Sequence, residues 1–270
     1  MLFSDVSLSR RLERAEGHAC LQFAEARRRV FPNSGSEWIE CAGAYAVFDG
    51  IDSPTTQSFG LGLFEELTAS TLDTIERFFL DRGASVLHEV SPLVGIPALS
   101  LLCARGYRPV EISNVLYRGV ETNASERADN TNVCVVAPEE AQLWNNISMR
   151  GWSHDHPELK DFLLQFGDIS SARENSVCFL AEVDGQPGAA GVLSMHEGVA
   201  LFGGAATVPE LRRRGLQAAL LAERLRYARD HGCDLAMMVA EAASNSQRNA
   251  ERKGFRIAYT RTKWRLEGVL

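Results

Sequence analysis

A basic loop in the second half of the chain has the residue types that bind a diphosphate. Residues 207–218 read Thr-Val-Pro-Glu-Leu-Arg-Arg-Arg-Gly-Leu-Gln-Ala, between a strand-like run and a helical pattern. The first N–H groups of a helix have no partner inside it, and the helix dipole favours anions there. Gly215 lets the backbone approach a ligand closely, and three arginines offer charged donors to phosphate oxygens. The pattern predicts a diphosphate site, with a merely basic helix start as the alternative.

Other phosphate-binding and nucleic-acid-binding classes fit this loop less well. No Gly-Lys-Ser/Thr triplet is present in it, which excludes a P-loop, and the absence of GxGxxG excludes a Rossmann fingerprint. The chain has 28 Lys and Arg against 35 Asp and Glu, a net charge of −7. A general nucleic-acid binder needs a dominant basic face, so we expect no nucleic-acid partner.

The two halves of the chain resemble each other. Residues 77–90 (RFFLDRGASVLHEV) align without a gap with residues 226–239 (RYARDHGCDLAMMV), and Arg, Asp, Gly and Val coincide. Further on, residues 105–108 match residues 253–256 at almost the same offset. Several matches in one order indicate a duplicated fold.

A polar segment separates the halves. Residues 121–132 contain no apolar side chain larger than alanine, so they form the expected linker between lobes over residues 1–120 and 133–270. The second half alternates strand-like and helical runs: strands 133–137, 177–183, 188–195, 199–207, 234–240 and 255–266, and helices from 138, from 157, over 216–231 and over 245–253. The first half shows helices 6–29, 70–82 and 96–105, strands 38–48, 57–63 and 85–90, and a closing strand pair ending at 119. We expect an α/β protein of two lobes, each with a mixed central β-sheet flanked by helices.

The element order and the basic loop together resemble the GCN5-related N-acetyltransferase (GNAT) superfamily. Its hallmark, Arg/Gln-x-x-Gly-x-Gly/Ala, corresponds to residues 212–217 here. Residues 204–209 fit the family's strand followed by proline, and Asn245 with the later Gly254-Phe255 fits its closing helix and strand. The resemblance covers roughly residues 131–266. It implies a tandem GNAT protein that uses acetyl-CoA as co-substrate and no metal.

The resemblance also implies which residues hold coenzyme A. The backbone of residues 205–207 would hold the pantetheine arm like an added strand, and the N–H groups of residues 213–218 would bind the pyrophosphate. Asn245 or Ser246 would lie near the sulfur. The expected cofactor-binding set is Ala205, Ala206, Thr207, Arg212, Arg213, Arg214, Gly215, Leu216, Gln217, Ala218 and Asn245. Gln217 replaces the family's last Gly or Ala, so its side chain must point away from the phosphates.

The catalytic groups are less clearly marked. The family often has a tyrosine, as general acid, four residues before the Gly-Phe pair, where this chain has Ala250. Ser246, Tyr259 or a water could replace it. Glu241 follows the buried strand 234–240, at the strand end where open α/β sheets place ligands, and is the first candidate base. Glu197 is a weaker candidate, and for Glu241 a solvated loop carboxylate is the alternative.

The acceptor side is expected after the first helix of the second lobe. Residues 149–157 read Met-Arg-Gly-Trp-Ser-His-Asp-His-Pro, where the resemblance places the acceptor pocket. Trp152, His154 and His156 are the expected substrate residues, because histidines could bind a carboxylate or transfer a proton. A His-x-His pair with one Asp is weak evidence for a metal site, so we expect none. An exposed loop that caps a helix is the alternative.

The first lobe lacks the basic loop. At the repeat offset, residues 212–217 fall on Leu63-Phe64-Glu65-Glu66-Leu67-Thr68, which has no glycine and two carboxylates that would repel a diphosphate. We expect a degenerate lobe that keeps the fold without the phosphate loop.

The expected function is transfer of an acetyl group to the amine of a small-molecule or amino-acid-like acceptor. A non-catalytic acyl-CoA-binding or sensory module is the alternative, and a toxin-type acyltransferase acting on tRNA is disfavoured by the acidic charge. We expect a monomer or homodimer with no membrane partner. We interpret the scattered cysteines as buried reduced thiols, with a zinc or disulfide site as the alternative. Together with the lack of a long apolar run in residues 1–14, they favour a cytoplasmic protein.

Overall fold

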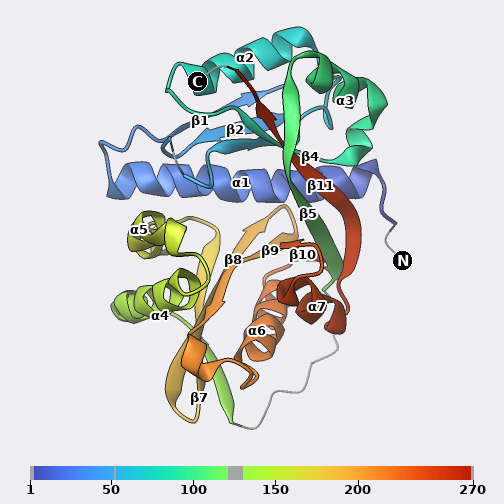
Figure 1. The fold of residues 1–270 in the computed structure, drawn as a ribbon. Coiled ribbons are helices and arrows are strands. Elements are labelled where there is room, and N and C mark those ends of the chain that lie inside the picture. Colours follow the sequence, from blue (N-terminus) through green and yellow to red (C-terminus); the bar gives the residue numbers. More distant parts are fainter. Residues whose placement is uncertain (1–2, 52, 121–129, 269–270) are drawn as a thin grey trace. The chain divides into compact units, whose positions relative to one another are not determined.

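The computed structural model describes residues 3–51, 53–120 and 130–268 (Figure 1). The chain folds as two compact units, one formed by Met1–Tyr117 with Val239–Leu270 and the other by Arg118–Met238. Most of the expected linker, residues 121–129, lies outside the described residues. Its last two residues already belong to strand β6 (Thr131–Val135).

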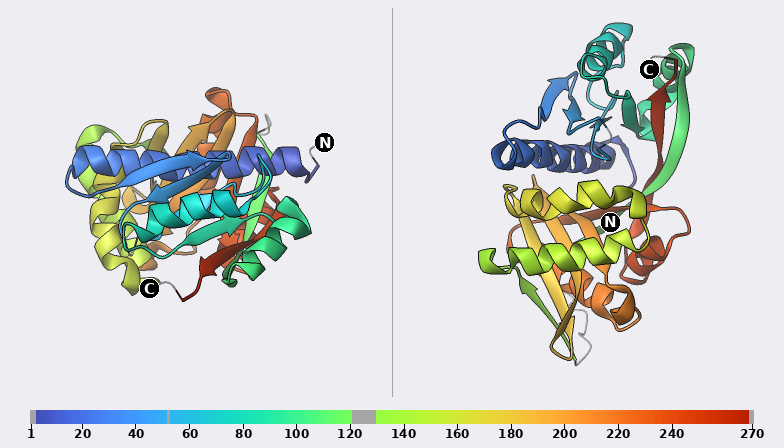
Figure 2. Two further views of the ribbon diagram at one scale, coloured as in Figure 1. Left: turned by 90° about the horizontal axis from the view of Figure 1, so that it is seen from above. Right: turned by 60° about the vertical axis from the view of Figure 1, so that its left-hand side comes forward.

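The second unit contains a mixed sheet with helices on both faces. Its strand order is β6-β7-β8-β9-β10, with antiparallel neighbours from β6 to β9 and a parallel β9–β10 pair. The further strands are β7 (Ser176–Val183), β8 (Gln186–His196), β9 (Val199–Thr207) and β10 (Leu235–Glu241). The helices are α4 (Ala141–Ser153), α5 (Lys160–Ser171) and α6 (Leu216–Asp230), with 3₁₀ turns at Pro138–Glu140, Pro157–Leu159 and Pro209–Leu211. Figures 1 and 2 show α4 and α5 on one face of this sheet and α6 on the other.

Local sequence signals explain two features of this unit. Asp184 and Gly185 both have positive φ, 53° and 75°, and close the β7–β8 hairpin, as their dipeptide predicts. Trp144 of α4 is buried and donates its indole N–H to the Phe179 carbonyl at 3.0 Å, which fixes α4 against β7. Helices α4 and α6 both contribute buried side chains to this unit.

The first unit also contains a mixed sheet, with the strand order β1-β2-β3-β4-β11-β5. The strands are β1 (Glu37–Cys41), β2 (Ala44–Phe48), β3 (Gln57–Phe59), β4 (Leu87–Val90), β5 (Tyr107–Gly119) and β11 (Arg256–Leu266). The helices are α1 (Val6–Val30), α2 (Ala69–Leu80), α3 (Gly95–Ala104) and α7 (Asn245–Arg252), with a 3₁₀ turn at Pro92–Val94. β3 and β4 are parallel and the other recorded pairs are antiparallel.

Strand β11 lies where the sequence did not place it. We expected residues 255–266 in the second lobe and a closing strand pair in the first. Instead β5 is one long strand, and β11 lies between it and β4, with Thr262 opposite both Val90 and Ile112. An apolar pattern indicates that a strand is buried, but it does not indicate which strands will be its neighbours. Here β11 pairs with β4 on one side and β5 on the other.

The duplicated sequence corresponds to similar local structure. Gly83 follows α2 and Gly232 follows α6, and both have positive φ, 68° and 80°. Gly106 and Gly254 likewise have φ of 94° and 81° after α3 and α7. The matching glycines therefore end matching helices, because only glycine adopts this backbone conformation without strain.

The cysteines agree only partly with the expectation of buried thiols. Cys103 and Cys134 are exposed thiols, not buried ones, whereas Cys233 is buried. None of the six cysteines, all within described segments, forms a disulfide. No helix in the described part of the chain is long and apolar enough to cross a membrane.

Candidate functional site

The basic loop forms an open helix start in the second unit. After the 3₁₀ turn, Arg213 and Gly215 have positive φ, 64° and 84°, and Gly215 is the N-cap of α6. No side chain of the described residues caps this end of the 15-residue helix, so its first N–H groups, which have no partner inside the helix, are not used by a capping side chain. Leu211 and Leu216 are buried against Gly188 of β8, and anchor the loop on both sides of the arginines.

The three arginines have different surroundings. Arg212 donates to both oxygens of Asp155, at 3.1 and 2.8 Å, and also to the carbonyls of Thr207 and Gly151, each at 3.3 Å. Arg214 pairs with Asp184 in the β7–β8 turn. Arg213 is exposed and makes no hydrogen bond or ion pair with any residue the structure describes. Of the three side chains, that of Arg213 is therefore free for a ligand.

Strand β9 ends in a segment that leaves its parallel neighbour. The recorded β9–β10 pairing ends at Leu201 opposite Met237, although β9 continues to Thr207. Gln217 donates its side-chain amide to the Thr207 hydroxyl at 2.8 Å. The Gln217 side chain therefore points back to β9 and away from the helix start, the orientation expected if the helix start binds phosphates.

Helix α4 approaches this strand end closely. A Cβ built on Gly151 would lie 2.6 Å from the Ala206 Cβ and 3.0 Å from the Thr207 nitrogen. Arg212 reinforces the contact, because it bridges β9, the α4 carbonyl of Gly151 and Asp155. The loop, the end of β9 and the end of α4 thus form one packed group.

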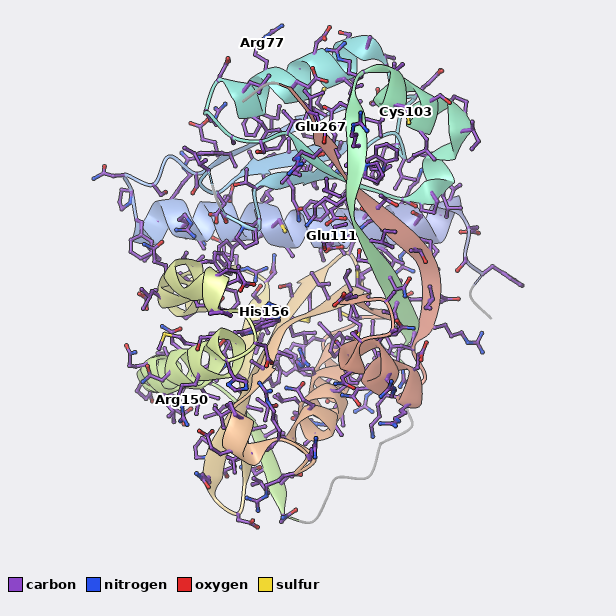
Figure 3. The ribbon with its side chains drawn as sticks, viewed as in Figure 1. Arg77, Cys103, Glu111, Arg150, His156 and Glu267 are labelled. Atoms are coloured by element: carbon purple, nitrogen blue, oxygen red, sulfur yellow. The ribbon has the colours of Figure 1, made fainter. Side chains whose placement is uncertain are left out.

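The expected acceptor residues lie at the end of α4. Trp152 is half-buried and its ring centroid lies 5.5 Å from that of His156, whose Nδ1 lies 3.2 Å from a Glu158 oxygen. Figure 3 shows His156 and Arg150 in this region. His154 is exposed after the last turn of α4. Asp155, which a His-x-His metal site would need, is already bound by Arg212, and the described residues contain no cluster suited to a metal ion.

The expected catalytic residues belong to the first unit. Glu241 is exposed at the end of β10, and Asn245 and Ser246 are exposed in the first turn of α7. The N-cap of α7 is Ser244, whose hydroxyl accepts the Gln247 N–H at 3.2 Å. The exposure of Glu241 and the absence of a described partner fit a solvated carboxylate as well as a base.

The two weaker candidates, Tyr259 and Glu197, stay predictions, and the structure describes their surroundings. Tyr259 is buried and donates to Glu13 at 2.9 Å, and burial next to this carboxylate raises the pKa of Tyr259. Glu197 lies in the β8–β9 turn, at the opposite end of β9 from the basic loop. Asp155 and Asp184 are contributors that the sequence missed, since no local pattern pairs them with arginines 57 and 30 residues away.

The comparisons with known proteins find a family match in the second half of the chain and a similar fold in solved structures. The acetyltransferase (GNAT) family matches residues 141–255. Among solved structures, a GCN5-related N-acetyltransferase from Kribbella flavida is 18% identical with a TM-score of 0.65, over 92% of this chain and 96% of its own. A tandem GNAT protein from the clavulanic acid biosynthesis pathway is 11% identical with a TM-score of 0.57, over 98% and 96%. A Drosophila protein is 13% identical with a TM-score of 0.55, over 97% and 95%.

No curated protein matches the chain. The solved structures are too distant in sequence to show more than the fold, but they cover nearly the whole chain. The family match covers only the second half, where the basic loop lies. Residues 141–255 thus match the acetyltransferase (GNAT) family, and the chain has the fold of tandem GNAT proteins over nearly its whole length.

Proposed function

We propose that the protein is an acetyl-CoA-dependent N-acetyltransferase for a small amine or amino-acid-like acceptor. The observation that carries this proposal is the uncapped start of α6 behind the left-handed Gly215, with the unpaired Arg213 beside it. Free N–H groups, the helix dipole and one free guanidinium form a site for a diphosphate. The residues proposed to line it are those of the basic loop, with the end of β9 for the pantetheine arm.

The proposed reaction is direct acyl transfer. The lone pair of a neutral amine attacks the thioester carbon, an amide C–N bond forms and the C–S bond breaks. One proton leaves the amine and one is taken up by the departing thiolate, so a base and an acid, or water, must serve the two steps. Glu241 and Ser246 remain our candidates for these roles, and Trp152, His154 and His156 for contacts with the acceptor.

The missing tyrosine supports a second candidate function, a non-catalytic acyl-CoA-binding module. Ala250 is fully buried at the position of the family's frequent acid, and Tyr259 is committed to Glu13. A protein that binds acetyl-CoA without turning it over needs neither group. Thiol release from acetyl-CoA with a panel of amines separates the two functions: turnover of any amine supports the enzyme, and binding without turnover supports the module.

Calorimetric titration with coenzyme A tests the site itself. We expect one site per chain, because the first lobe has Glu65 and Glu66 near its corresponding loop. Replacing Arg213 with Ala should weaken binding about fivefold to tenfold, the effect of one exposed charged contact. Gly215→Glu should abolish it, since a carboxylate would replace the ligand's anion at a strained position.

Arg77 provides the matched control. It is an exposed arginine of α2 in the first unit and points away from the body of that unit (Figure 3). Arg77→Ala should leave coenzyme A affinity unchanged. Two equal sites per chain, or full affinity in Gly215→Glu, would show that the loop is not the cofactor site.

A further inference from the structure

Arg224 is a buried cation that the basic loop does not explain. It lies in the middle of α6, its residue is 3% exposed, and no acidic side chain pairs with it in the described chain. Burial without a counter-ion lowers the pKa of this guanidinium to about 10. A buried unpaired charge is costly, so an apolar residue would be expected here if packing were its only role.

The contacts of Arg224 converge on the irregular part of the β8–β9 pair. Its Nη1 donates to the Val192 carbonyl at 3.0 Å and to the Gly203 carbonyl at 3.3 Å, and its Nε lies 3.3 Å from the Leu220 carbonyl. The guanidinium also lies 5.1 Å from the centroid of the Phe202 ring, within range of a cation–π contact.

The Val192 and Gly203 carbonyls belong to a pair that borders a β-bulge. Ala190 pairs with Ala206, but Val192 pairs with Gly203, so β9 has one residue more than β8 between the two pairs. Gly204 in this segment has a φ of +57°. An extra residue leaves ladder groups without cross-strand partners and re-aims the backbone. The bulge falls in the part of β9 that has already left β10.

The neighbouring glycine is adapted to the arginine. A Cβ on Gly191 of β8 would lie 3.2 Å from both the Cζ and Nη1 atoms of Arg224. The guanidinium therefore rests directly on the backbone of β8 where a side chain would displace it. Arg224, Gly191 and the bulge form one unit on the α6 side of the sheet.

We propose that Arg224 is a positioning residue for the acyl group: it holds the β9 bulge from behind and places a positive charge beside it, so that backbone N–H groups of the bulge can polarise the carbonyl of a bound thioester. This role rests on the proposed function. When the amine attacks, negative charge develops on the carbonyl oxygen, and fixed dipoles backed by a cation in a water-poor site stabilise it. The phosphates bind elsewhere, at the loop, so their affinity should not depend on Arg224.

The test compares Arg224→Met, Arg224→Lys and Gly191→Ala with the wild-type full chain. Met keeps the length without the charge or the donors, Lys keeps the charge, and the Gly191 variant keeps Arg224 but displaces it. Arg226→Met is the matched control, since Arg226 lies on the same helix but is exposed and pairs with Glu223 and Asp230. Probes are coenzyme A and acetyl-CoA with a ¹³C-labelled carbonyl.

We expect coenzyme A affinity to change less than about twofold in every variant. In Arg224→Met, kcat should fall roughly tenfold to hundredfold with KM for acetyl-CoA little changed. The infrared band of the bound carbonyl should shift toward that of free acetyl-CoA. Arg224→Lys and Gly191→Ala should each show a smaller fall in kcat and a smaller shift of the carbonyl band than Arg224→Met. The Arg226→Met control should change neither kcat nor the band.

Two results would contradict different claims. If the wild-type chain binds neither coenzyme A nor acetyl-CoA, the proposed function fails and this role fails with it. If the wild type binds both, the decisive variant is Arg224→Met, or Gly191→Ala if Arg224→Met does not fold. Should that variant keep the wild-type carbonyl band and kcat, the positioning role is wrong while the proposed function stands.

Discussion

Arg261 of β11 is the charged residue whose removal should destabilise the first unit most. Its side chain is 2% exposed and lies 3.2 Å from a Glu13 oxygen, 2.6 Å from a Glu16 oxygen and 2.9 Å from a Glu89 oxygen. Glu13 and Glu16 come from α1 and Glu89 from β4, so this guanidinium ties β11 to two elements of the first half. Lys263 also lies 3.4 Å from Glu89 and compensates in part.

Arg261→Met keeps most of the side-chain volume but leaves buried carboxylates without their main cation. Breaking a buried ion pair by removing one partner costs about 3–5 kcal/mol, so the free energy of unfolding at pH 7 should fall by about that amount. The loss should be smaller at pH 5. Burial raises the pKa of Glu13 to about 7, against the opposing effect of Arg261, so at pH 5 this carboxyl is protonated and needs the cation less.

Urea denaturation followed by circular dichroism at pH 5 and pH 7 measures both effects. Hydrogen exchange of the β11 amides distinguishes local release of this strand from unfolding of the whole unit. Arg265→Met is the control, because Arg265 is half-exposed and lies 3.7 Å from Glu267, a surface pair worth well under about 1 kcal/mol. A loss below about 1 kcal/mol in Arg261→Met at pH 7, or a larger loss at pH 5, would refute the reasoning.

Three further predictions concern buried groups. The pKa of Glu13 is raised in the folded state, so its carboxyl stabilises the fold at pH values below its unfolded pKa near 4.5, and this stabilisation is lost as the pH rises to about 7. Glu13→Gln should remove that loss, measured as the urea midpoint against pH. Burial lowers the pKa of His88 to about 3, so stability should fall below about pH 6.5 by at most about 1.4 kcal/mol per pH unit, and His88→Gln should flatten this slope in the same titration. Gly151→Val should displace the end of β9, because the added side chain would overlap Ala206. It should destabilise the fold by about 1–3 kcal/mol in thermal unfolding and weaken coenzyme A binding in calorimetry. Unchanged binding would show that the packing of α4 against β9 does not affect the coenzyme A site.

The His88 prediction depends on a continuous chain of hydrogen bonds in the first unit. His88 Nδ1 lies 2.6 Å from the Ser58 hydroxyl, its Nε2 lies 2.9 Å from the Tyr107 hydroxyl, and Tyr107 donates to Glu76 at 3.0 Å. A neutral imidazole satisfies both hydroxyls, one nitrogen accepting and the other donating. Protonation would leave one of these contacts without an acceptor, which adds to the cost of burying the charge.

The sequence alone determined features that depend on neighbours along the chain. The start of α6 at Leu216, the hairpin at Asp184-Gly185 and the left-handed glycines after matching helices all follow from local backbone preferences. The basic loop could be recognised for the same reason, because helix start, glycine and arginines are contiguous. These preferences act over a few residues and need no knowledge of the rest of the fold.

Only the tertiary structure decided which charged groups meet. Three adjacent arginines look equivalent in the sequence, yet Asp155 and Asp184 engage two of them and leave Arg213 free. Likewise the helical pattern of α6 does not reveal that Arg224 lies on the β9 bulge, and the pattern of residues 256–266 does not reveal that β11 joins the first unit. Ion pairs and strand pairings join residues tens to hundreds of positions apart, and they form only where the folded backbone brings complementary groups within a few ångströms.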